Sequence, residues 1–252
     1  MIRFLLALLL LAQTANAAER VVADMSQSLV SITANFDGTA ILIFGAVKRN
    51  SPAPKGQLEV IIAVTGPSSP VIVRKKSRIL GIWVNREAVK IDFAPSFYAV
   101  ASTNPLPEVL SQVEDFQRRV SIERMIRSAE SAKDTKKIEK FAQAIVRIRD
   151  ANGLYTETGG KVKLTEGTLF KTEIALPSNL VEGDYLTRIF LTRDKKVVDE
   201  YQTTIAVRKV GLERWIYNLA HERPLVYGIL SLVIAIFAGW LASAIFRVLR
   251  LN

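Results

Sequence analysis

The chain has 252 residues, enough for one large domain or two small ones beside any targeting segments. Nearly half of its residues are apolar, and the absence of cysteine excludes disulfides, thiolate metal sites and cysteine nucleophiles. A single histidine excludes a two-histidine metal site within one chain, and the net charge of +10 favours an anionic partner such as membrane lipid.

The first residues have the pattern of a secretory signal peptide. Arg3 precedes an apolar run, residues 4–12, that is too short to cross a bilayer, which needs about 20 residues. Small residues follow at the positions that signal peptidase reads, so cleavage is expected between Ala17 and Ala18. Residues 1–17 are therefore predicted to be removed. Export of the following domain argues against nucleic acid as a partner.

Residues 18–103 are predicted to form a β-rich region. Short segments rich in β-branched residues alternate there with glycine, proline and asparagine. Two of these segments, Leu29–Phe36 and Thr39–Val47, flank Asp37-Gly38, a dipeptide that favours a two-residue hairpin turn. We therefore expect these two segments to pair with each other.

The most distinctive stretch of this region runs from Gly66 to Asn85, just before Arg86. Its cations and its tryptophan make up the candidate binding residues, which are Arg74, Lys75, Lys76, Arg78, Trp83 and Arg86. Arginine and tryptophan are frequent anchors of binding sites, so one interpretation is a docking site for a partner or for lipid. The other is a hairpin with a solvated basic turn and a tryptophan in the core.

Residues 104–153 are predicted to form a helical hairpin that packs on a sheet. Asn104 and Pro105 suit the start of a helix, and Asn152-Gly153 suits the end of one. Between them, apolar residues recur at helical spacing on both sides of a polar break at Ser131–Thr135. The first stripe is Leu106, Val109, Leu110, Val113, Phe116, Val120, Ile122, Met125 and Ile126, and the second is Ile138, Phe141, Ala142, Ile145 and Ile148.

Strands return in residues 154–210. Within them, Gly183-Asp184-Tyr185 resembles the turn that leads into the penultimate strand of immunoglobulin-like sandwiches, where a tyrosine hydrogen-bonds back across the corner. The predicted fold is therefore mainly β with an α-helical hairpin insertion, built as one or two β-sandwich or immunoglobulin-like modules. The alternative is a single α+β domain.

The C-terminal part has the pattern of a membrane anchor. Residues 211–223 form an amphipathic segment that is expected to lie at the membrane interface. Residues 224–246 contain no charged side chain and are long enough to cross a bilayer. Because the preceding domain is exported, we expect a single-pass protein of the bacterial inner membrane. Its N-terminal domain would lie in the periplasm, and residues 247–252 in the cytoplasm.

Small residues recur at every fourth position of the predicted span. They are Ser231, Ala235, Gly239 and Ser243, which fall on one face of a helix. Small residues let two helix backbones approach closely in lipid, so this face is expected to pack against a second copy of the chain or another membrane protein. The alternative is that small residues are simply common in membrane helices.

Several segments together resemble the alphaproteobacterial putative transmembrane protein family. They are Gly66–Asn85, Pro95–Ser102, Gly183-Asp184-Tyr185, Gly211–Arg214 and Gly239–Ser243, and the resemblance extends over nearly the whole mature chain. It implies a signal peptide, an exported domain and a C-terminal span. It gives no catalytic residues to carry over, and it makes a permease of the sulfite-exporter type a candidate partner.

No strong catalytic motif and no metal-ligand spacing occurs in the sequence, so no metal or other cofactor is expected. The leading hypothesis is a non-enzymatic accessory or adaptor protein that works with another envelope or membrane protein. The alternatives are a membrane-tethered enzyme that uses carboxylates or a serine–lysine pair, and a solute-binding module. A pocket with two acids would favour the enzyme, whereas a basic patch at residues 74–86 would favour the adaptor.

Overall fold

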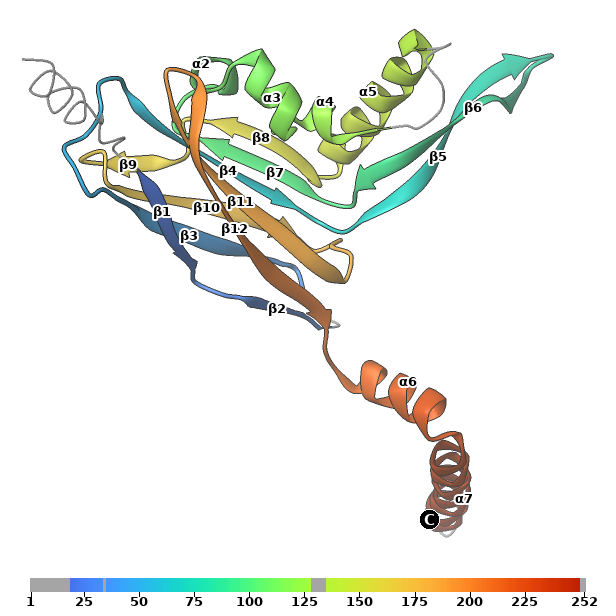
Figure 1. Ribbon diagram of the computed structural model, residues 1–252. Coiled ribbons are helices and arrows are strands. Elements are labelled where there is room, and N and C mark those ends of the chain that lie inside the picture. Colours follow the sequence, from blue (N-terminus) through green and yellow to red (C-terminus); the bar gives the residue numbers. More distant parts are fainter. Residues whose placement is uncertain (1–18, 34, 128–134, 250–252) are drawn as a thin grey trace, which may run out of the picture. The chain divides into compact units, whose positions relative to one another are not determined.

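The computed structural model describes residues 19–33, 35–127 and 135–249, and the chain divides into two units. Unit 1 comprises residues up to Val30 together with Asp37–Val207, and unit 2 comprises Ser31–Phe36 and Arg208–Asn252. Figure 1 shows the sheets and helices of unit 1 and the two C-terminal helices of unit 2. The predicted signal peptide and its cleavage site between Ala17 and Ala18 lie outside the described residues.

A four-stranded antiparallel sheet forms one layer of unit 1. Its order is β1 (Arg20–Met25), β3 (Gly38–Lys48), β10 (Leu169–Pro177) and β9 (Lys163–Thr165). Buried and exposed residues alternate along β10, with Phe170, Thr172, Ile174 and Leu176 on the buried face. This period of two means that one face of the sheet packs inward and the other meets solvent.

A six-stranded sheet forms the middle layer. Its order is β2 (Leu29–Ile32), β12 (Lys196–Lys209), β11 (Gly183–Arg193), β4 (Leu58–Thr65), β7 (Tyr98–Ser102) and β8 (Tyr155–Gly159). Every residue of β4 and of β7 is buried, because one face of the sheet meets the four-stranded sheet and the other meets helices (Figure 1). Strands β7 and β8 run parallel, which the helical crossover between them allows.

The fold prediction is confirmed: the chain is mainly β, with a helical insertion and one apolar C-terminal helix. Strands from before and after the helices share the same two sheets, so the two β-rich regions do not form separate modules. Tyr185 donates a hydrogen bond across the corner to the carbonyl of Val181 at 2.8 Å, as its turn predicted. The immunoglobulin-like topology itself stays a prediction.

The predicted hairpin around Asp37-Gly38 is wrong. Strand β3 pairs with β1 and β10, whereas β2 lies beside β12. Gly38 has a φ of 111° and begins β3, and a Cβ there would lie 2.9 Å from the carbonyl oxygen of Leu176. The absence of a side chain at Gly38 therefore lets the backbone of β10 approach closely, and Gly38 does not form a two-residue turn between β2 and β3.

In its described residues, 104–127 and 135–153, the helical insertion contains four helices, not two. They are α2 (Leu106–Val109), α3 (Gln112–Arg118), α4 (Ile122–Met125) and α5 (Thr135–Ala151). Ser111 caps α3 by accepting a hydrogen bond from the N–H of Glu114, and Arg119 ends it in the left-handed conformation. These local caps divide the first predicted helix into three pieces.

This division changes which apolar residues reach the core. Val113 and Phe116 of α3 and Ile148 of α5 are 66%, 65% and 53% exposed, so their assignment to the two core stripes is wrong. Other members of the two stripes, such as Val109, Val120 and Phe141, pack in a cluster with Tyr98 and Tyr155 of the middle sheet. The Tyr98 hydroxyl donates to the carbonyl of Val120 at 2.8 Å, which ties the connection between α3 and α4 to the sheet.

Unit 2 carries the two C-terminal helices, α6 (Leu212–Glu222) and α7 (Pro224–Leu249). Residues 224–245 of α7 are long and apolar enough to cross a membrane, and an 18-residue window within them has a mean hydropathy of 2.3. The break between the helices falls at Arg223, and Pro224 begins α7, where the missing N–H of proline removes no helical hydrogen bond.

Candidate functional site

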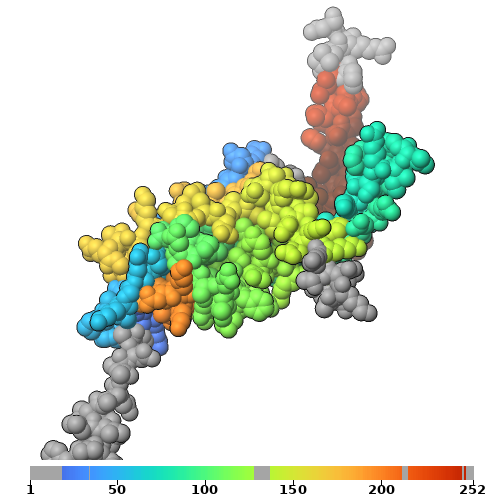
Figure 2. Space-filling model, turned by 90° about the horizontal axis from the view of Figure 1, so that it is seen from above, coloured from blue at the N-terminus to red at the C-terminus, as the bar shows by residue number. Residues whose placement is uncertain are grey.

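A two-stranded arm carries all of the candidate binding residues. It consists of β5 (Ser68–Ile79) and β6 (Ile82–Pro95), which pair with each other and with no other strand of the described residues. In Figures 1 and 2 the arm, coloured turquoise, extends beyond the end of α5. Its base is fixed, because Ile91 is buried in the core and Phe93 exchanges two backbone hydrogen bonds of 3.0 Å with Arg127.

The tip of the arm is a tight turn with apolar residues on both sides. Leu80 and Gly81 have positive φ values of 48° and 89°, as in the two-residue hairpin turns that match the twist of the strands. Leu80 is 100% exposed, Ile82 65% and Trp83 67%. The turn therefore lies beyond the basic residues, and the interpretation that placed Trp83 in the core is wrong.

The cations of the arm lie along its strands behind this tip. Arg74, Lys75, Lys76, Arg78 and Arg86 are all exposed. None of them forms an ion pair with another described residue. The structure thus brings the six predicted binding residues together on one arm, as an apolar tip with a cationic stem. Their role in binding stays a prediction.

An acidic groove of about 790 Å³ lies between α5 and the shorter helices. Its walls include Asp115, Glu123, Glu139 and Glu157. Burial raises the pKa of Glu157, and the neighbouring charges of Glu123 and Asp115 raise it further.

The acidic groove brings several carboxylates together, and a pocket with two acids was the feature expected to favour an enzyme. However, Asp115 accepts hydrogen bonds from the N–H groups of Val120 and Ser121 and from the Ser121 hydroxyl, at 3.1, 2.7 and 2.8 Å. This carboxylate therefore has a structural role between α3 and α4. No group of three or more ligating side chains suited to a metal occurs among the described residues.

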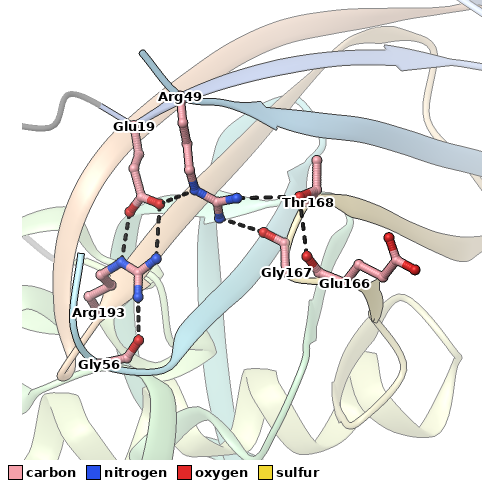
Figure 3. A network of polar contacts seen from close by, with 7 residues as sticks. All are labelled: Glu19, Arg49, Gly56, Glu166, Gly167, Thr168 and Arg193. Atoms are coloured by element: carbon pink, nitrogen blue, oxygen red, sulfur yellow. Dashed lines mark hydrogen bonds and ion pairs between the residues drawn. The ribbon is translucent and has the colours of Figure 1, made fainter. Parts of the chain in front are cut away.

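A buried ion network centres on Glu19, which lies just before β1. Its two partners are Arg49, just after β3, and Arg193, the last residue of β11. The Glu19 side chain is only 2% exposed and lies between Arg49 and Arg193 (Figure 3). It accepts from Arg49 Nε at 2.6 Å and from Arg193 Nε and Nη2 at 2.7 and 2.9 Å. The remaining donors of the two guanidinium groups reach the Gly56 and Gly167 carbonyls and the Thr168 hydroxyl, the last at 3.3 Å.

The charges in this network stabilise one another. The hydrogen bond from Arg193 lowers the pKa of Glu19 against the opposing effect of burial, and Arg49 lowers it further. The same contact raises the pKa of Arg193. Sequence reasoning missed this network, because Glu19 lies 30 and 174 residues from its partners and belongs to no motif.

The four small residues of the predicted packing face all lie within α7. Ser231, Ala235, Gly239 and Ser243 are exposed, and a Cβ at Gly239 would meet no described atom within 4 Å apart from its chain neighbours and the nearby backbone of α7 itself. The Ser231 hydroxyl donates to the Gly228 carbonyl at 2.9 Å, which satisfies it within the helix. Packing of this face against a second helix stays a prediction.

These features define a single-pass membrane protein with a β-rich domain. The model of the family described as "Putative transmembrane protein (Alph_Pro_TM)" matches residues 20–248. The chain belongs to this family, as its sequence resemblance predicted. A search of curated proteins finds no match. Family and structure together establish a membrane anchor, and the family description assigns no activity.

Proposed function

We propose that this protein is an accessory or adaptor protein of the bacterial inner membrane. Helix α7 anchors the chain, and its β-rich domain binds another envelope or membrane protein from the periplasmic side. The β5–β6 arm is the observation that carries the proposal. A large apolar side chain left in water forgoes about 1.5–3 kcal/mol that burial would provide, and here three of them sit at one exposed tip.

The composition of the arm suits a docking element. Tryptophan and arginine dominate the energetics of protein interfaces, and an apolar anchor surrounded by charges is the usual arrangement. The base of the arm is fixed by the core, so docking requires little ordering of the backbone. The cations would favour a partner with an acidic rim around an apolar pocket.

Photo-crosslinking in intact membranes tests the proposal. A photoreactive residue in place of Leu80 is expected to give one discrete adduct with a protein, whose identity mass spectrometry then establishes. Leu169 provides the control, because it is 58% exposed on β10, away from the arm, and is expected to give no such adduct. Adducts with lipid alone at Leu80 would refute protein docking and make the tip a membrane contact.

The proposed orientation has its own test. A reporter enzyme fused after Asn252 is expected to be active only if it functions in the cytoplasm, whereas one inserted at Gly153, an open turn after α5, should require export. N-terminal sequencing should find a mature chain that begins at Ala18. A chain that still begins at Met1 would contradict the cleavage site and leave the orientation untouched.

A further inference from the structure

We propose that the groove between α5 and the middle of the β5–β6 arm binds the phosphate-bearing headgroup of an anionic lipid. The groove has a volume of about 730 Å³. Its cations come from two separate elements and are Arg74, Lys75, Lys137, Lys140 and Arg147. Glu87 is the only acid among the described residues that line it.

The charge arrangement favours an anion. None of the five cations forms an ion pair with another described residue, so they repel one another across the hollow in the absence of a ligand. Lys137, Lys140 and Arg147 fall on one face of α5, and β5 brings its two cations to the same hollow. Positive charges gathered along low-dielectric walls concentrate the electric field and attract an anionic group.

The floor of the groove distinguishes a lipid from a free phosphate. Val73, Phe141, Ala144 and Ile148 line it beside the cations, and Phe141 belongs to the buried core. An apolar surface next to a cluster of cations fits an amphiphile, whose headgroup pairs with the charges while its glycerol and upper acyl carbons cover the apolar residues. Because α7 anchors the same chain in a membrane, lipid headgroups are also the anions that it meets in abundance.

This inference goes beyond the proposed function and can fail separately from it. Lys140 and Arg147 lie on α5, whereas the docking tip is Leu80, Ile82 and Trp83 of the arm. Variants of the two α5 cations therefore test the lipid site without altering the tip.

The experiment measures lipid binding to the full chain in a non-ionic detergent by native mass spectrometry, with phosphatidylglycerol and, separately, phosphatidylcholine. We expect selective binding of phosphatidylglycerol. The variant K140Q/R147Q should bind it about thirtyfold more weakly, because each cation near an anionic headgroup strengthens binding roughly fivefold. The reversal K140E/R147E should abolish the selective site.

The matched control is K55Q/K196Q, which removes the same charge from two exposed lysines outside the groove. It should bind phosphatidylglycerol within twofold of the wild type. Equal binding by all variants would overturn the proposal, because the lipid would then bind through α7 alone. An equal loss of binding in the control would also overturn it, because the lipid would then respond only to the net charge of the protein. Displacement of the lipid by millimolar inorganic phosphate would also overturn it, because the apolar floor would then contribute nothing.

Discussion

Replacing Glu19 with glutamine is expected to lower the free energy of unfolding of unit 1 by about 3–5 kcal/mol. Removing one partner of a buried ion pair leaves the other charges without compensation, and Glu19 compensates two guanidinium groups at once. Glutamine keeps the volume of the side chain but has one oxygen to offer. Its NH₂ group would face an arginine donor in place of the second acceptor.

A thermal melt of the full chain in detergent, followed by near-ultraviolet circular dichroism, measures this effect. For a unit of this size, 1 kcal/mol corresponds to about 2–4 °C, so Tm should fall by about 6–20 °C. Glu166→Gln is the matched control. Glu166 lies near the same network, but its side chain is exposed and only its backbone carbonyl takes part (Figure 3). A similar Tm in Glu19→Gln and the control would show that the network does not contribute to stability.

The pH dependence of the same pair of proteins follows from the lowered pKa of Glu19. Its unfolded-state pKa is about 4.3, and the folded-state value lies below this. The stabilisation is therefore complete above the unfolded value and is lost as the pH falls through the folded value. The difference in Tm between the wild type and Glu19→Gln should narrow below about pH 4, because only the wild type has a carboxylate at position 19 that becomes protonated and loses its charge.

Local patterns predicted the class of each segment but not its partners. The apolar run of α7 and the strand segments are visible in the sequence because length, hydropathy and β-branching are local properties. The pairing of β2 with β12 depends on residues more than 160 positions apart in the chain, so a turn-prone dipeptide suggested a nearer partner. The Glu19 network is hidden for the same reason.

The clustering of the candidate binding residues could be read from the sequence, but their exposure and their arrangement in space could not. The cations and Trp83 lie within 13 consecutive positions, residues 74–86, so their clustering needed no structure. Whether Trp83 is buried depends on whether another strand covers the hairpin, and in the structure none of the described strands does. The groove beside the arm could not be predicted, because three of its cations come from α5, more than 50 residues further along the chain.

Reversing four cations of the arm to glutamate, in the variant R74E/K75E/K76E/R78E, is expected to abolish the crosslinked partner adduct at the tip. The four reversals change the charge around the docking tip by eight, which turns an attractive field into a repulsive one for an acidic partner. The side chains are exposed and form no ion pair with a described residue, so each contributes little to folding. We therefore expect Tm to move by less than about 4 °C.

Two smaller variants separate the arm from the groove behind it. Lys76 and Arg78 do not line the groove, whereas Lys140 and Arg147 line it and lie outside the arm. If the tip docks a protein, K76E/R78E should reduce the adduct severalfold and leave selective lipid binding intact, while K140E/R147E should do the reverse. An adduct of normal intensity in the quadruple variant would show that the four cations are solvated surface charges and do not contribute to partner binding. Partner binding would then rest on Leu80, Ile82 and Trp83 alone, and their replacement by serine would have to remove it.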